Sequence, residues 1–187
     1  MGEPRIPTPV KLFVGMLSPE IELFEICTDL LSAEYGPIDY RSEILPWRVT
    51  DYYQDEMGTG ILRKFIFFER LVDPAVLATT KLLTNSIEAR YSTTGGNAVR
   101  RRVNLDPGYV TEAKVVLAST KDFSHRVYLG LGIYAEVTLY YATRGKTFLS
   151  FDHTYPDFRT KETMDMFNRA REILRTTLHR KGPQTRL

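Results

Sequence analysis

The stretch VNLDPGYVTEAK combines an amide, a carboxylate, a Pro-Gly pair and a lysine. Alternation along a strand would place Asn104 and Asp106 on the face that points away from the core. Pro107-Gly108 favours a type II turn, and a helix after it would offer free backbone N–H groups to an anion, with Lys114 adding positive charge. The stretch therefore predicts a phosphate site, although turn and cap hydrogen bonds would explain the same residues.

A second polar cluster lies in STKDFSHR, directly before a predicted β-hairpin. Lys121 and Arg126 could hold a phosphate, and His125 could act as a general acid or base because histidine titrates near neutral pH. The hairpin register sets Glu136 opposite Arg126. The alternative is an exposed cross-strand pair, which would contribute little.

A third cluster lies in TDYYQDEMG. Asp51 could coordinate a hard cation, and Tyr52 or Tyr53 could stack on a base, while a capped turn explains the same residues. Tracing the expected strands puts this loop at one end of a sheet and Asp106 at the other, roughly 20 Å away. We therefore expect the loop and Asp106 to belong to different sites.

Metal and nucleotide-hydrolysis motifs are weak in this sequence. His153 with His125, Asp106 and Glu136 would form the only plausible ligand set, but their spacing does not require a metal, and no metal site is predicted. The sequence has no GxxxxGK[ST] P-loop and no GxSxG nucleophile motif. Cys27, the single cysteine, lies on the apolar stripe of a predicted helix, which is a poor position for a nucleophile.

Composition limits the class of protein. With 187 residues, 43% of them hydrophobic, the chain is expected to form a single domain. The net charge of +2 is not that of a dedicated nucleic-acid binder, but the residues from Arg159 onward carry eight Lys or Arg against three Asp or Glu. One cysteine and the lack of a long apolar run favour a cytoplasmic protein with no membrane segment.

Strand and helix patterns alternate in the first part of the chain in the order βαββαβ. The predicted helices open at Ser18-Pro19 and at Asp73-Pro74. The first and third strands are the most apolar, as expected for the two central strands of a ferredoxin-like unit. The predicted strands are KLFVGML, IDYRSEI, LRKFIFFERL and RRRVNLD. We therefore predict an α+β fold with a ferredoxin-like unit over residues 10–106.

The remaining residues, 107–187, are expected to form an extension packed on this unit. It should contain a short helix over residues 111–119, a β-hairpin and a long helix from about Thr160. The hairpin register predicts a three-residue turn over 130–132 with its last glycine at positive φ. Residues 182–187 should form a flexible tail.

Seven motifs in order together resemble one known group. They are PVKLFVGML, TDYY, FERL, VNLDPGY, STKDFSHRVYLG, IYAEVTL and TYPDFR, and they span nearly the whole chain. The group is the prokaryotic domain-of-unknown-function family 4416. The resemblance implies no activity, cofactor or catalytic residue. Some members are labelled GTP-binding proteins, but the chain has no P-loop and no NKxD motif.

The leading hypothesis is a binder of a phosphate-bearing ligand, a nucleotide or RNA, at the first two clusters. The first alternative is a metal-assisted hydrolase that uses Asp106, His125 and Glu136. The second is a non-catalytic protein that binds a protein partner through the basic C-terminal helix. No cofactor is predicted, and the sequence leaves open whether the protein is an enzyme.

Overall fold

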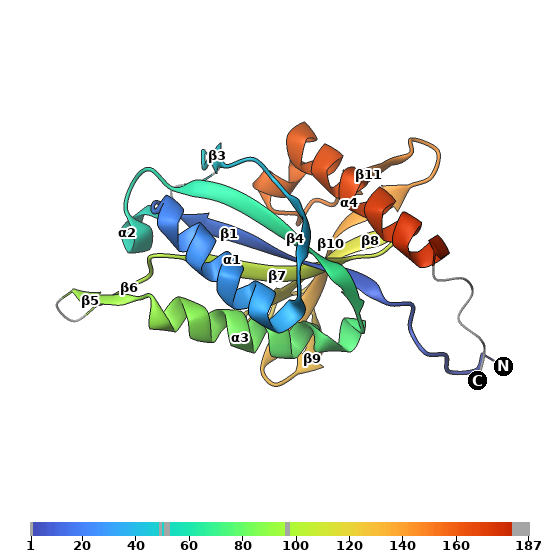
Figure 1. Ribbon diagram of the computed structural model, residues 1–187, viewed down its shortest axis with the longest axis horizontal. Helices are drawn as coiled ribbons and strands as arrows, with labels where there is room; N and C mark the ends of the chain where they lie inside the picture. Colours follow the sequence, from blue (N-terminus) through green and yellow to red (C-terminus); the bar gives the residue numbers. More distant parts are fainter. Residues whose placement is uncertain (1, 49, 51–52, 96–97, 181–187) are drawn as a thin grey trace.

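One antiparallel β-sheet organises the chain, and helices cover both of its faces (Figure 1). The computed structural model describes residues 2–48, 50, 53–95 and 98–180. The predicted α+β class is confirmed. Among these residues, no helix is long and apolar enough to span a membrane.

The elements follow one another with short connections. The helices are α1 (Ile21–Tyr35), α2 (Gln54–Met57), η1 (Pro74–Val76), α3 (Leu77–Arg90), η2 (Pro156–Arg159) and α4 (Lys161–Arg180). The strands are β1 (Val10–Ser18), β2 (Ile38–Arg41), β3 (Leu45–Pro46), β4 (Leu62–Val72), β5 (Thr93–Gly95), β6 (Ala98–Arg100), β7 (Asn104–Val110), β8 (Lys114–Ser119), β9 (Val127–Gly130), β10 (Ile133–Ala142) and β11 (Thr147–Ser150).

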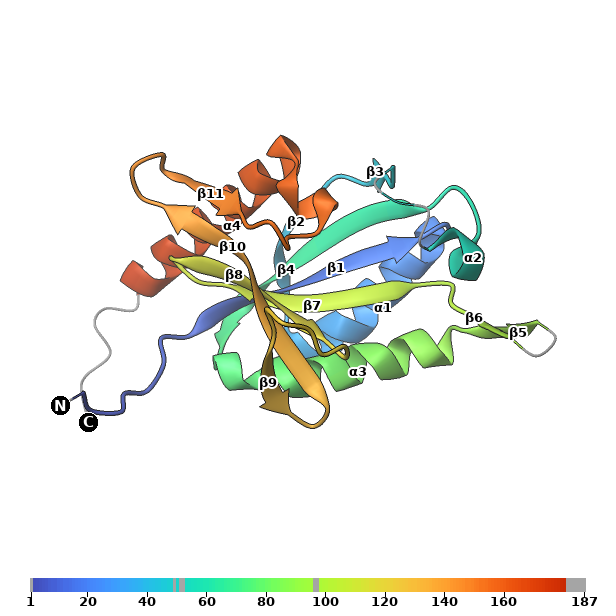
Figure 2. The same cartoon turned by 180° about the vertical axis from the view of Figure 1, so that it is seen from behind.

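The strand order of the large sheet is β11-β10-β8-β7-β1-β4-β2, with β3 paired to β4 and β9 paired to β10. All of these pairs are antiparallel. The two most apolar of the strands predicted from the sequence, β1 and β4, lie side by side, as expected. The part of the chain after β7 continues the same sheet through β8, β10 and β11, and its last helix covers one face (Figure 2).

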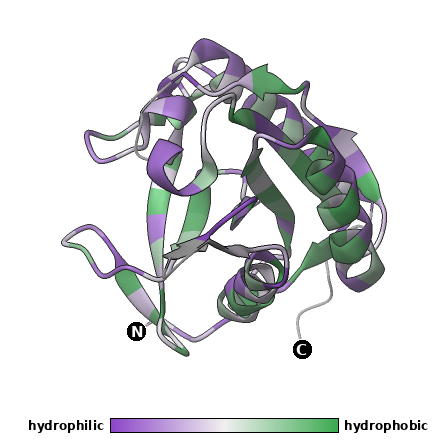
Figure 3. Ribbon diagram, turned by 90° about the vertical axis from the view of Figure 1, so that its left-hand side faces the viewer, coloured by the Kyte–Doolittle hydropathy of each residue, from purple (hydrophilic) through white to green (hydrophobic). Residues whose placement is uncertain are grey.

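Each face of the sheet has its own apolar core. On one face, β1 and β4 pack against α1 and α3 through residues such as Phe24, Leu31 and Ile87. On the other face, α4 packs against the same strands, with the ring of Phe13 5.0 Å from that of Phe167. Every residue of β1 is buried because both faces are covered. Hydrophobic residues, which are green in Figure 3, are accordingly most frequent in the strands and in the helices that face them.

The prediction of a short helix over residues 111–119 is wrong, because strand β8 (Lys114–Ser119) occupies most of this segment. Thr111 does accept hydrogen bonds from the backbone N–H groups of Ala113 and Lys114, as a helix cap would, but here they close the tight turn between β7 and β8. Val115 and Val116 then continue as a buried strand, the conformation that β-branched side chains favour.

The turn predicted at Pro107-Gly108 is also wrong, because both residues lie within β7. Pro107 pairs with Val14 of β1, and Gly108 pairs with Phe13. A Cβ atom at Gly108 would lie 2.4 Å from the carbonyl oxygen of Val116, so the glycine is needed for close strand approach and not for a turn. No helix follows, and the anion site expected at its N-terminus does not exist.

The β9–β10 hairpin follows the predicted register except at its tip. Tyr128 pairs with Tyr134, and Gly132 has the expected positive φ of 75°. Gly130 pairs with Ile133, so the loop has two residues and not three. Leu131 also adopts a positive φ of 58°, as the first residue of a type I′ turn must.

We expect Gly108→Ala to lower the free energy of unfolding by about 1–3 kcal/mol, because the added methyl group must displace the Val116 carbonyl or the Phe13 ring. Urea unfolding measures this loss. Gly145→Ala is the matched control, since a Cβ there would have its nearest neighbour, Thr147 Cγ2, at 3.7 Å. Equal stabilities of the two variants would contradict the close packing of β7 on β8.

Candidate functional site

A cleft with a volume of about 630 Å³ lies at one end of the sheet. Its size is within the range of small-molecule binding sites. Of the described residues, five basic and four acidic side chains line it, together with the aromatic side chains Trp47, Tyr53, Tyr155 and Phe158. The charged lining consists of Arg63, Lys81, Arg101, Lys121, Arg126, Glu88, Asp106, Glu136 and Asp157.

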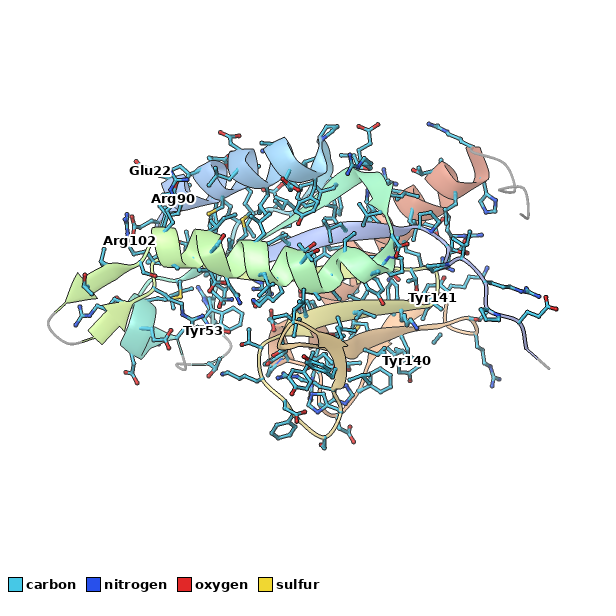
Figure 4. All side chains as sticks on the ribbon, turned by 90° about the horizontal axis from the view of Figure 1, so that it is seen from below. Glu22, Tyr53, Arg90, Arg102, Tyr140 and Tyr141 are labelled. Atoms are coloured by element: carbon cyan, nitrogen blue, oxygen red, sulfur yellow. The ribbon has the colours of Figure 1, made fainter. Side chains whose placement is uncertain are left out.

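The cleft brings together residues from all three predicted clusters. Its lining includes Asn104 and Asp106 from the first, Lys121, Arg126 and Glu136 from the second, and Tyr53 from the third. Asp51 and Tyr52 lie outside the described residues. Tyr53 lies beside α2 in Figure 4, and burial, reinforced by nearby Asp106, raises the pKa of its hydroxyl.

The predicted separation of roughly 20 Å between the Tyr53 loop and Asp106 is therefore wrong. The error comes from the boundaries of one strand. A strand over residues 100–106 would have ended with Asp106 at the far end of β1. Because β7 begins at Asn104, which pairs with Leu17, its first residues lie beside the end of β1. The start of β4 lies there too, since Leu62 pairs with Ser18.

Two predicted residues lie outside the cleft lining. Lys114 is exposed at the opposite end of β8 from Ser119, where it pairs with Tyr140. His125 contacts the cleft indirectly, since its Nε2 atom lies 3.1 Å from Oε2 of Glu136. Its ring stacks on that of His153 at a centroid distance of 4.2 Å.

The histidines do not converge on a metal position. The His153 ring uses Nε2 to contact the Val137 carbonyl oxygen at 3.1 Å. Within the described part of the chain, no group of three His, Cys, Asp or Glu side chains is arranged to hold a metal ion. Cys27 is buried on α1, and burial raises the pKa of its thiol to about 12. It is therefore a core residue.

Arg63 of β4 is the most buried basic side chain of the cleft that sequence reasoning missed. Its guanidinium forms ion pairs with Asp157 at 3.0 Å and Asp106 at 3.6 Å. It lies 4.4 Å from the centre of the Phe65 ring, and Gly15 makes room for it. Its buried Nε atom has no hydrogen-bond partner among the described residues. The only sequence signal is a charged residue inside an apolar strand.

Lys81 and Glu88 of α3 were also missed. The Lys81 ammonium donates to the Leu105 carbonyl at 2.8 Å and lies 3.6 Å from Asp106. Glu88 accepts a hydrogen bond from the Leu105 backbone N–H at 2.7 Å. Both side chains are buried on the face of α3 that also carries Leu77 and Thr84. Their spacing in the sequence is that of one helix face, which could have revealed them.

The predicted contact between Arg126 and Glu136 is confirmed, with Arg126 Nε donating to Glu136 at 2.8 Å. The pair is not an exposed one, because the Glu136 side chain is only 1% exposed. Arg126 also donates to the Ser119 hydroxyl, the Lys121 carbonyl and the Tyr155 hydroxyl. Arg126 therefore fixes the wall of the cleft and is largely occupied by the protein itself.

Two carboxyl groups in the cleft have pKa values above their ordinary values, so both hold a proton more strongly than an exposed carboxyl group does. Burial, the largest cause, raises the pKa of Asp157, although Arg63 acts in the opposite direction. Burial likewise raises the pKa of Glu88 against the effect of Lys81. Carboxyl groups perturbed by burial and by charge partners in a cleft are typical of functional sites.

Fold and cleft together define an α+β protein with a charged, aromatic-lined cleft at one end of an antiparallel sheet. The chain belongs to the family described as Domain of unknown function (DUF4416), which matches residues 8–174. The resemblance inferred from the seven motifs is thus confirmed. No match was found among curated proteins or among solved structures.

The raised pKa of Asp157 has a consequence for stability. The folded state favours the protonated carboxyl, so this group contributes stability below its ordinary pKa of 3.8, and the contribution is lost as pH rises through the folded-state value. We therefore expect the advantage of wild type over Asp157→Asn to shrink as pH rises above the ordinary value of 3.8. Urea unfolding at a series of pH values measures it.

Asp29→Asn makes the same chemical change on the exposed surface of α1, outside the cleft. The advantage of wild type should shrink in the Asp157 comparison and not in this control. An advantage over Asp157→Asn that grows with pH would contradict the assigned direction.

Proposed function

We propose that the cleft binds a small phosphate-bearing ligand and that a nucleotide is the ligand class that fits it best. The observation that carries the proposal is the convergence of basic side chains from four separate segments on one cleft with aromatic rings around it. Phosphate needs positive charge and directed N–H donors, whereas a base needs a flat apolar surface.

The basic side chains differ in what they offer a phosphate. Lys121 is exposed and lines the cleft, so its side chain is accessible to an anion. Arg63 is fixed in place and presents a planar guanidinium, the group suited to bidentate phosphate recognition. Arg126 is held by four protein groups and serves to position its neighbours.

Aromatic and acidic groups supply contacts for the rest of a nucleotide. The Trp47 and Tyr53 rings lie 5.9 Å apart, and Tyr155 is partly exposed in the cleft wall. Asn104 donates to Asp106 at 2.7 Å and so orients a carboxylate that can accept hydrogen bonds from sugar hydroxyls. His125 would act only as a proton donor relayed through Glu136.

The fold supports the proposal by analogy alone. We take β7-β1-β4-β2 with α1 and α3 as a ferredoxin-like unit, and the rest of the chain as an extension within one domain. That fold serves many nucleotide and RNA binders, but fold does not determine function. We also propose a cytoplasmic location, from the single cysteine.

Three other functions stay predictions. RNA would fit the same basic and aromatic groups, although a cleft of this volume suits one nucleotide better than a chain. A metal-assisted hydrolase would require Asp106, His125 and Glu136 to share an ion, whereas His125 lies against Glu136 from outside the lining. Partner binding would use basic residues of α4 such as Arg169 and Arg175, which point to no particular partner.

We expect Lys121→Met to weaken nucleotide binding about tenfold or more, since it removes a charge-assisted contact to phosphate, while leaving thermal stability nearly unchanged because the side chain is exposed. Isothermal titration with AMP and GMP measures the affinity. Lys114→Met is the matched control, with an exposed lysine at the far end of β8. Equal affinities of the two variants would exclude Lys121 from the site, and wild type that binds neither nucleotide would overturn the proposed function.

A further inference from the structure

The charge of the cleft lining limits how much negative charge a ligand can bring. Among the described residues, five basic and four acidic side chains line the cleft, and they leave a net charge of +1 when all of them are ionised. Arg101 is in addition paired with Glu56, which lies outside the lining. The cleft is thus close to neutral, although it is rich in charged groups. It differs from sites for polyphosphates, where positive charge must exceed the protein's own negative charge.

The acidic groups are held where solvent cannot screen them. The side chains of Glu88 and Asp157 are each 9% exposed, and that of Glu136 is 1% exposed. Buried charges are screened by salt much less than exposed ones. Each further phosphate group in the cleft would meet the ionised carboxylates, among them Asp106 and Glu136 in their ion pairs with Arg63 and Arg126, at a high electrostatic cost.

Arg63 is a buried basic group of the cleft whose hydrogen bonds the described residues leave incomplete. Arg63 is 6% exposed and lines the cleft, but its Nε atom is without a hydrogen-bond partner in the described part of the chain. Its ion pair with Asp106, at 3.6 Å, is longer than a hydrogen bond. Buried polar atoms are rarely left unsatisfied, so the Arg63 guanidinium retains hydrogen-bonding capacity that the described residues do not use.

The carboxylates need hydrogen-bond donors, which a nucleoside provides without adding charge. Asp106 is the most exposed of the four acidic side chains, at 28%, and is therefore the one a ligand can best reach. Ribose hydroxyls and exocyclic amino groups are neutral donors of the required kind. A phosphate monoester carries at most two negative charges at neutral pH.

We propose that the cleft selects nucleoside monophosphates over the corresponding di- and triphosphates, with the one phosphate at Arg63 and the nucleoside donors at Asp106. This inference rests on the proposed function, because it specifies the number of phosphates for the same site. In the absence of magnesium, a monophosphate should bind about tenfold tighter than the triphosphate of the same base.

The experiment is isothermal titration of full-length protein with adenosine, AMP, ADP and ATP, and with the guanosine series, in buffer containing a chelator. Inorganic phosphate and ribose 5-phosphate separate recognition of the phosphate from recognition of the base. We expect affinity to rise from the nucleoside to the monophosphate and then to fall with each added phosphate.

Asp106→Asn tests the electrostatic cause. It removes one negative charge from the lining and keeps the side-chain shape, so the preference for monophosphate over triphosphate should narrow about threefold or more. The ratio of the two affinities is the readout, because it is insensitive to an overall loss of binding. Asp29→Asn, on the exposed surface of α1, should leave the ratio at its wild-type value.

The outcomes separate the two proposals. Triphosphates that bind as tightly as monophosphates, or tighter, would overturn the selectivity and leave nucleotide binding intact. No binding of any nucleotide would overturn the proposed function and the inference with it. Should Asp106→Asn fail to fold in a thermal unfolding check, the wild-type series alone decides the selectivity.

Discussion

The buried guanidinium of Arg63 is the interaction on which the cleft depends. It connects β4 to Asp106 on β7 and to Asp157 on η2, three segments far apart in the sequence. The rings of Phe65 and Phe158 lie beside it, so its charge is shielded from solvent on the protein side. Loss of this cation would leave the buried Asp157 without its ion-pair partner, which costs far more than the pair itself contributes, whereas Asp106 would keep its contact with Lys81. The position and the charge balance of the cleft therefore depend on one residue.

Buried ion pairs of this kind are weak evidence for stability, because desolvation offsets most of the attraction. Lys81 and Glu88 are examples, since both are charged side chains at buried positions of α3, on a helix face that packs on the sheet and where apolar side chains are usual. Hydrophobic residues there would give a core at least as stable. Charged groups that cost stability and line a cleft are what the proposed ligand would require.

Local sequence patterns were sufficient to predict most helices and strands, but they did not predict the pairing register of strands that are distant in the sequence. The apolar run of β1, the helix start at Asp73 and the pairing of Tyr128 with Tyr134 follow from neighbours in the sequence. β7 was misplaced because Pro107-Gly108 has the composition of a turn, whereas here close packing against Phe13 requires the glycine. That displacement alone separated two clusters that in fact line the same cleft. Arg63 was missed because burial of a charge is decided by partners that only the folded chain brings near.

The cleft is lined by residues from both parts of the chain, the part up to and including β7 and the part after it. The part of the chain up to and including β7 supplies Arg63, Lys81 and Asp106, and the part after β7 supplies Lys121, Glu136 and Asp157. The end of β1 and the starts of β4 and β7 lie at one end of the sheet, and β8 continues it so that Ser119 and Lys121 reach the same place. Each part alone would expose buried charges whose partners are in the other. The added strands and η2 are therefore part of the site as much as of the fold, since their residues form part of its wall and contribute to its charge.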